Sequence, residues 1–387
     1  MRGNMVKYKC MKFSNKGENE MSGIKNKIIT ISGEPVSGKS TVVKMLKEKY
    51  EKMGYKIHIV ATGHVFRDRA IQEYTKMYPD RTDANLADIQ EDETFAEKRA
   101  EIDIAIDRWV EQLGKEINRE DRPNDVYIID SRLAWHNIPD SYAVRLTVDE
   151  KIAGKRVFSD SKRGIEDRYD TVEEAIEKTR QRKIGEISRY KKRYGVNLDD
   201  PENYDLIVDT SYSNTEELAD IIIDGEKSYR GGTYYPKMWA SPACFIGTQT
   251  DRQTCSASGM YGYRPEELAE IMKRDGYKPE LGEIVVLENY GEKFVQDGHH
   301  RAIAVLAMGK TLTPYRVNKD PNANKNMEKD QNNVWFAYDW SDCISYYGGT
   351  IGKQKQFENF SVKDLTAYEH RIKPMIDEMT RKSQEGR

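Results

Sequence analysis

The sequence has few cysteines and no long apolar run. Its four cysteines, Cys10, Cys244, Cys255 and Cys343, show no CxxC spacing and no clustering with the six histidines. We therefore expect neither a disulfide framework nor a structural zinc site, and we predict a reducing, cytoplasmic compartment. The longest apolar run, Ala302–Met308, is far shorter than the roughly 20 residues that cross a bilayer, so no membrane contact is predicted.

The chain also lacks a strong excess of charge of one sign. Lys plus Arg total 62 and Asp plus Glu total 65, which gives a formal net charge of -3. No overall field favours nucleic acid or an anionic membrane, so any such binding must come from a local patch. The 387 residues exceed the roughly 150 typical of one domain, and at least two domains are predicted.

Strand-like runs alternate with helical patterns through residues 27–226. The predicted strands are Ile28–Ile31, Ile57–Val60, Val126–Ile129, Val144–Val148 and Leu206–Val208. The predicted helices are Thr41–Met53, Phe95–Ile117, Val172–Tyr194 and Thr215–Ile223. This alternation is typical of an α/β domain with a parallel sheet covered by helices on both faces.

The pattern changes after residue 226, where Gly, Pro, Tyr and Thr follow without periodicity. We predict a smaller α+β domain over residues 227–320, with a helix at Pro265–Arg274. Residues 1–26 are polar and predict a flexible leader, and residues 321–387 predict an aromatic and charged extension.

A phosphate-binding loop follows the first predicted strand. Residues 33–40 read GEPVSGKS, which satisfies the pattern GxxxxGK[ST] between a strand and a helix. Backbone N–H groups of such a loop surround phosphate at the positive end of the helix, and the lysine reaches the outer phosphates. The residues predicted to bind ATP are Gly33, Ser37, Gly38, Lys39, Ser40 and Thr41.

A second carboxylate is expected beside this loop. The strand Val126–Ile129 ends in Asp130, and if it lies beside the loop strand then Asp130 and the Ser40 hydroxyl can both serve Mg²⁺. Arg132 follows two residues later and is expected to point into the ligand crevice at the carboxyl edge of the sheet.

Two further groups of basic residues follow. A polar loop between two helices is expected to hold Lys155, Arg156, Lys162, Arg163 and Arg168. The next predicted helix holds Arg180, Arg182 and Arg189. These arginines predict a catalytic lid that stabilises the transferred charge and excludes water, although a solvated helix face is the alternative.

These landmarks, in this order, resemble the cytidylate kinases among the nucleoside monophosphate kinases, particularly the archaeal type. The matching segments are 37–41 (SGKST), 63–67 (GHVFR), 101–103 (EID), 106–108 (IDR), 130–134 (DSRLA), 189–190 (RY), 194–195 (YG) and 204–211 (YDLIVDTS). The resemblance implies an ATP- and Mg²⁺-dependent kinase in which Arg67 and Arg132 hold the acceptor and the lid arginines face the phosphates. Glu34, Val36 and His64 depart from the residues usual in this family.

The second unit carries the sequence DGHHRA at residues 297–302, at the start of a predicted helix. This segment resembles the ParB/sulfiredoxin-like fold, which implies that Asp297, His299, His300 and Arg301 bind a phosphate-bearing ligand. A glycine turn, a helix N-terminus and an arginine also form an anion site on physical grounds, whereas a helix cap with packed histidines is the alternative.

These features favour a kinase whose acceptor is a pyrimidine nucleotide such as (d)CMP, or a hydroxymethylpyrimidine in DNA, with DNA contact as a possible consequence. One alternative is a nucleotide-controlled DNA-binding or partition-type module, although residues 233–317 show no concentrated basic stripe. Another is a serine-type metabolite kinase activity in the second domain, because the ParB-like fold does not specify one activity.

Overall fold

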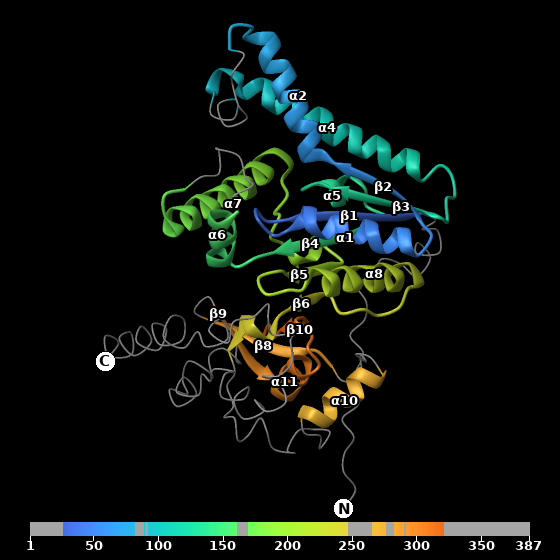
Figure 1. Cartoon of the computed structure of the whole chain (residues 1–387). Coiled ribbons are helices and arrows are strands. Elements are labelled where there is room, and N and C mark those ends of the chain that lie inside the picture. The colour runs from blue at the N-terminus through green and yellow to red at the C-terminus, as the bar shows by residue number, and fades with distance from the viewer. Residues whose placement is uncertain are drawn as a thin grey trace, which may run out of the picture.

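The computed structural model (Figure 1) describes residues 26–81, 89, 92–160, 169–246, 265–275, 282–289 and 292–320. The predicted extension and nearly all of the predicted leader lie outside these residues. Among the residues described, no helix has the length and apolar character needed to cross a membrane.

The predicted parallel sheet is confirmed. Its strands pair in the order β2-β3-β1-β4-β5, all parallel. They are β1 (Lys27–Gly33), β2 (Lys56–Ala61), β3 (Asp125–Asp130), β4 (Tyr142–Thr147) and β5 (Leu206–Asp209). Because parallel strands share one carboxyl edge, the loop after β1 and the end of β3 are adjacent, with Ile31 opposite Asp130.

Strand residues alternate between two cores, one on each face of the sheet. Ile29 and Ile31 of β1 pack with Val42 and Leu46 against one face, whereas Ile28 packs with residues of the other face. Successive side chains of a strand point to opposite faces, so near-continuous apolar runs are what a sheet covered on both sides requires.

Helices cover both faces, as predicted (Figure 1). The first face is covered by α1 (Lys39–Lys52) and α8 (Thr215–Gly231), and the second by α2 (Thr62–Met77), α4 (Ala96–Ile117) and α5 (Ala134–Asn137). Short 3-10 turns lie at η2 (Glu93–Phe95), η4 (Pro201–Asn203) and η5 (Pro242–Cys244).

Two helices, α6 (Glu150–Ser159) and α7 (Val172–Tyr194), pack on each other near the carboxyl edge of the sheet (Figure 1). The bounds of α7 match the prediction, but Lys155 and Arg156, which were expected in the polar loop before it, lie within α6. The other basic residues of that predicted loop, Lys162, Arg163 and Arg168, lie outside the described residues. Asp149 starts this helix by accepting hydrogen bonds from the backbone N–H groups of Lys151 and Ile152, a capping signal that the sequence does contain.

The sheet continues into the second unit and becomes mixed. Strand β6 pairs parallel to β5 and antiparallel to β10, and the order continues β10-β8-β9-β7. The elements are β6 (Met238–Ala240), β7 (Phe245–Ile246), α10 (Pro265–Asp275), β8 (Ile284–Asn289), β9 (Glu292–Asp297), α11 (His299–Ala307) and β10 (Thr313–Val317). The division into two domains remains a prediction, and β6 belongs to the hydrogen-bonded sheet on both sides.

A partly buried carboxylate also connects the two parts. Glu217 of α8 accepts hydrogen bonds from Thr311 N and Oγ1, each at 2.7 Å, and from Leu312 N at 3.3 Å. Leu312 in turn packs in the core of the first face. Burial of the Glu217 carboxyl outweighs these bonds and raises its pKa.

We predict that Gly154→Ala destabilises the fold by about 1–3 kcal/mol, because the added methyl would overpack the contact between α6 and α7. A Cβ on Gly154 would lie 2.3 Å from Ile176 Cγ1 and 2.8 Å from the Ile176 backbone nitrogen. Denaturant unfolding monitored by circular dichroism measures the loss.

Gly185→Ala is the matched control on α7. A Cβ there meets no atom within 4 Å, so the substitution should be neutral or stabilise the helix by about 0.5–1 kcal/mol. Equal free energies of unfolding for the two variants would show that the helices do not pack as described.

Candidate functional site

The phosphate loop between β1 and α1 has the geometry of an anion cradle. A Cβ on Gly33 would lie 2.6 Å from Ser37 Oγ, so a side chain there would collide with the loop. Gly38 has a φ of +80°, and open space lies where its side chain would be. In the described structure no side chain caps α1 and no acidic residue occupies its first turn, which suits a bound anion.

Residues of other elements hold the backbone of the phosphate loop in a strained conformation. Val36 adopts a φ of 63°, a conformation that β-branched residues rarely take. Its carbonyl accepts a hydrogen bond from Arg156 at 3.4 Å, and Thr210 Oγ1 donates to the carbonyl of Ser37 at 3.0 Å. Helix α6 and the end of β5 therefore fix the loop against the sheet.

Asp130, at the end of β3, lies beside the loop lysine. Its carboxylate is 3.9 Å from Lys39 Nζ, and its carbonyl accepts a hydrogen bond from Thr62 Oγ1 at the start of α2. Arg132 donates to the carbonyl of Gly33 at 3.0 Å. The structure thus brings the loop, the end of β3 and the start of α2 to one point.

Helix α7 adds a carboxylate to this cluster of cations. Glu186 is buried, forms an ion pair with Arg132, and lies 3.5 Å from Arg182 Nε. Lys39 is also under its electrostatic influence. A protein carboxylate therefore lies among three basic side chains next to the phosphate loop, where it offers them the charge that a phosphate would offer.

The basic groups depress one another's proton affinity. Burial lowers the pKa of Lys39, and the charge of Arg132 lowers it further. Burial likewise lowers the pKa of the Arg132 guanidinium, with Arg182 and Arg189 adding to the effect. Because an incoming anion relieves both penalties, the cluster has the electrostatics of a phosphate site.

The remaining predicted residues lie at different distances from this cluster. Arg180 pairs with Glu177 on the exposed side of α7, and Arg189 lies 5.3 Å from the Tyr190 ring centroid. Arg67 is exposed on α2, with its guanidinium 3.1 Å from His64 Nδ1. The structure brings Lys39, Asp130, Arg132 and Arg182 together and leaves Arg180 and Arg67 in local pairs.

The donor set for a metal ion fits Mg²⁺ in type. Ser40 and Thr41 lie exposed on the first turn of α1, and Asp130 reaches the same loop through its contact with Lys39. A hydroxyl and a carboxylate are the hard oxygen ligands that Mg²⁺ prefers when it also binds phosphates.

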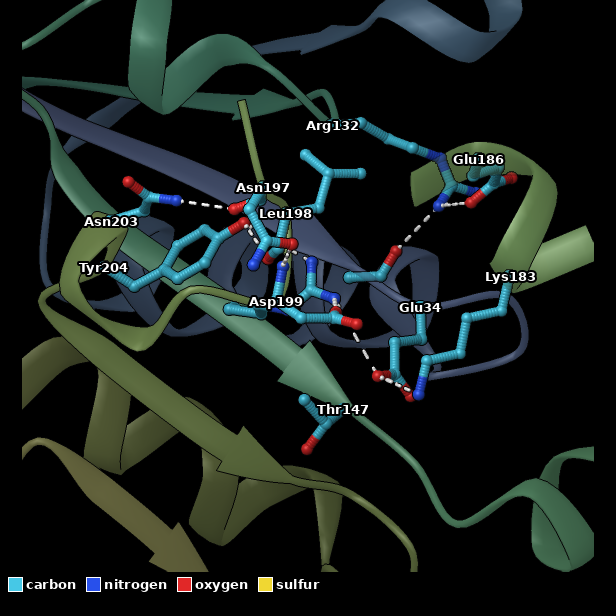
Figure 2. A network of polar contacts seen from close by, with 12 residues as sticks. Glu34, Arg132, Thr147, Lys183, Glu186, Asn197, Leu198, Asp199, Asn203 and Tyr204 are labelled. Carbon is cyan, nitrogen blue, oxygen red and sulfur yellow. Dashed lines mark hydrogen bonds and ion pairs between the residues drawn. The ribbon is translucent and has the colours of Figure 1, made fainter. Parts of the chain in front are cut away.

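Sequence reasoning assigned no role to several residues that build this site. Figure 2 shows Glu34 of the phosphate loop facing Lys183 of α7, with Glu186 and Arg132 paired one helical turn away. Arg145 of β4 completes the network between Glu34 and Asp199. The unusual acidic residue at position 34 was the sequence signal for this network. The sequence contains many lysines, however, and does not show which of them pairs with Glu34.

The glycine turn of the second unit is closely packed. Arg301 is buried and donates a hydrogen bond to Asp297 Oδ2 at 2.8 Å. A Cβ on Gly298 would lie 3.0 Å from the Arg301 guanidinium. His299 is buried, whereas His300 is half-buried. The phosphate-binding role of these residues remains a prediction.

Comparisons with known proteins agree with this geometry. The sequence model of the cytidylate kinase-like family matches residues 28–212. A cytidylate kinase of Methanocella arvoryzae is 32% identical over 195 residues, covering 50% of this chain and 94% of that protein. A cytidylate kinase of Methanocaldococcus jannaschii is 31% identical over 200 residues, with 94% of it covered. The phosphate loop and cation cluster thus lie in a nucleotide kinase domain, and the chain belongs to the cytidylate kinase-like family.

The family defines the chain as an ATP-dependent phosphotransferase. The matching region also occurs inside a larger protein, because an S-adenosylmethionine-dependent nucleotide dehydratase of Lacinutrix mariniflava is 29% identical over 196 residues, 51% of this chain and 35% of that protein. A crystal structure of an uncharacterized protein from Eubacterium ventriosum aligns with 52% of this chain and 99% of its own, at 15% identity and a TM-score of 0.35.

We predict that His299 makes the fold acid-sensitive. Burial, together with the nearby His300 and Arg301, lowers its pKa from 6.5 to about 4. Between these pH values the unfolded chain binds a proton that the folded chain does not, so stability falls by roughly 3 kcal/mol as the pH drops through this window.

The measurement compares the free energy of unfolding of the wild type and His299→Gln at pH 7 and pH 4.5. The wild type should lose more stability than the variant over this interval. Parallel pH profiles would mean that His299 titrates normally in the folded protein.

Proposed function

We propose that the chain transfers a phosphoryl group from ATP to a pyrimidine nucleoside monophosphate, with CMP or dCMP as the acceptor. The observation that supports this most is the convergence of Arg132 and Arg182 on the buried Glu186 carboxylate beside the phosphate loop, whose Lys39 lies 3.9 Å from Asp130. Basic groups brought this close need an anion to compensate their charges. The cytidylate kinase relatives supply the acceptor class.

In this proposal Lys39 and the loop amides bind the outer phosphates of ATP, while Arg132 and Arg67 bind the acceptor. Ser40 and Asp130 would hold Mg²⁺, which when bound neutralises charge on the phosphates. Phosphoryl transfer needs positioning and electrostatic stabilisation rather than a covalent protein group, so a cluster of fixed cations is sufficient chemistry.

Helix α7 would serve as the closing element. Arg182 already reaches the cluster through Glu186, and the charge of Arg189 already acts on Arg132, whereas Arg180 is engaged by Glu177. An acceptor phosphate that binds Arg132 would compete with the Glu186 carboxylate for the guanidinium. Arg182 would then be released toward the transferred group.

The second unit is proposed to bind a phosphate-bearing ligand at Asp297, His299, His300 and Arg301. Since Arg301 is engaged by Asp297 at 2.8 Å, such a ligand would compete with that carboxylate for the guanidinium. A hydroxymethylpyrimidine in DNA is a second acceptor class for the kinase domain, and an acceptor screen tests it directly.

We expect Lys39→Ala to reduce phosphoryl transfer by at least about a hundredfold, because a fixed cation on the phosphates is lost. ATP consumption is measured with CMP, dCMP, UMP, hydroxymethylated DNA and serine as acceptors. Turnover of CMP or dCMP above the other acceptors would support the proposal, and preferential turnover of DNA or serine would contradict it.

Lys44→Ala is the matched control on the same helix. Lys44 is exposed on α1 away from the loop pattern, so this variant should keep wild-type turnover. Substantial activity in a folded Lys39→Ala protein would exclude this loop as the ATP site.

We also predict that Arg132→Ala and Arg67→Ala raise the KM for the acceptor about tenfold or more, through loss of charge-assisted hydrogen bonds, with a smaller change in the KM for ATP. Steady-state kinetics with each substrate varied in turn give both constants. A large loss of ATP affinity with an unchanged acceptor KM would reverse the assignment of these arginines.

A further inference from the structure

The phosphate loop of this chain carries a buried carboxylate. The side chain of Glu34 is only 7% exposed, and it accepts a hydrogen bond from the backbone N–H of Val148 at 3.0 Å. Its neighbour Gly33 begins the loop that surrounds phosphate. A negative charge built into an anion site opposes binding of a triphosphate unless a cation compensates it.

Two cations face this carboxylate, and they belong to different elements of the fold. Lys183 Nζ lies 2.9 Å from Glu34 Oε1. Arg145 lies at 3.8 Å and is shared with Asp199. Arg145 belongs to the sheet and Lys183 to α7, so full compensation of Glu34 requires that α7 lie against the loop.

The state of Lys183 agrees with this pairing. Burial disfavours its charged form, but the Glu34 carboxylate, together with the charges of Asp199 and Glu150, outweighs burial, and the pKa of Lys183 is raised. Lys183 therefore remains a cation at neutral pH while its side chain is 26% exposed.

The same contact positions the rest of α7. Lys183 and Glu186 are three residues apart, so they lie on one face of the helix. Lys183 contacts the loop and Glu186 contacts Arg132, as Figure 2 shows. The C-terminal end of α7 is fixed separately, since Arg193 pairs with Asp103 of α4 at 2.9 Å.

We propose that Glu34 and Lys183 form a latch that couples docking of α7 to ATP binding. With α7 docked, Lys183 compensates the loop carboxylate and the loop accepts the triphosphate. With α7 away, Glu34 opposes the phosphates. Both are positioning residues, and the inference rests on ATP binding at this loop but not on the identity of the acceptor.

Two substitutions, singly and combined, separate the effect of the Glu34 charge on ATP binding from the effect of the Glu34–Lys183 ion pair on α7 docking. Lys183→Met leaves Glu34 compensated only in part, by the Arg145 that Asp199 shares, and should weaken ATP binding about tenfold or more. Glu34→Gln keeps an oxygen for the Val148 N–H and removes the charge, so in the double variant Glu34→Gln/Lys183→Met the ATP affinity should return to within about threefold of wild type.

Docking of α7 is measured independently by amide hydrogen exchange over residues 172–194. Exchange should be faster than wild type in Lys183→Met, in Glu34→Gln and in the double variant, because each lacks the ion pair. Lys183→Arg keeps a cation and should restore both ATP affinity and slow exchange.

ATP affinity is measured by calorimetric titration of the full chain without acceptor, so an incorrect acceptor would not affect the result. Lys192→Met is the control, since Lys192 is an exposed lysine of the same helix and should change neither quantity. The proposal is overturned if Lys183→Met binds ATP as tightly as wild type, or if the double variant binds as weakly as Lys183→Met. It is also overturned if exchange in α7 is the same in all variants.

Discussion

The contact between α7 and the phosphate loop depends on two ion pairs, each formed by a largely buried carboxylate and a basic side chain. Glu34 with Lys183 and Arg132 with Glu186 are two ion pairs of opposite sense across the same interface. Each contains a largely buried carboxylate, and removing one partner would leave an uncompensated charge in a low-dielectric environment. In one pair the helix supplies the cation and in the other it supplies the carboxylate. The two pairs therefore also specify the position of α7 along the loop, because sliding the helix would bring like charges together.

This interface depends in turn on the parallel sheet. The order β2-β3-β1-β4-β5 places the ends of β1, β3 and β4 next to one another. Lys39 follows β1, Asp130 ends β3, and Arg145 lies on β4, so three separate segments reach one carboxyl edge. The nucleotide site is therefore a property of strand order as much as of the loop itself.

The second unit is attached through backbone hydrogen bonds and packing. Strand β6 pairs with β5 on one side and β10 on the other, and Glu217 accepts hydrogen bonds from Thr311. Breaking this connection would leave strand edges unpaired and would remove the hydrogen bonds of the Glu217 carboxylate. The arrangement gives the kinase domain and the glycine turn of residues 297–301 a continuous sheet in common.

The sequence alone determined the alternation of strands and helices, the phosphate loop and the bounds of α7, because these follow from local periodicity and glycine chemistry. It also indicated Asp130 and Arg132, since Asp130 ends a strand at the ligand edge and Arg132 follows it by two residues. Tertiary structure decided which charges meet. The sequence pattern does not pair Glu34 with Lys183, nor Arg132 with Glu186, although it contains all four residues. Ion pairing and sheet continuation join residues far apart in the chain, so they depend on geometry that forms only when the elements pack.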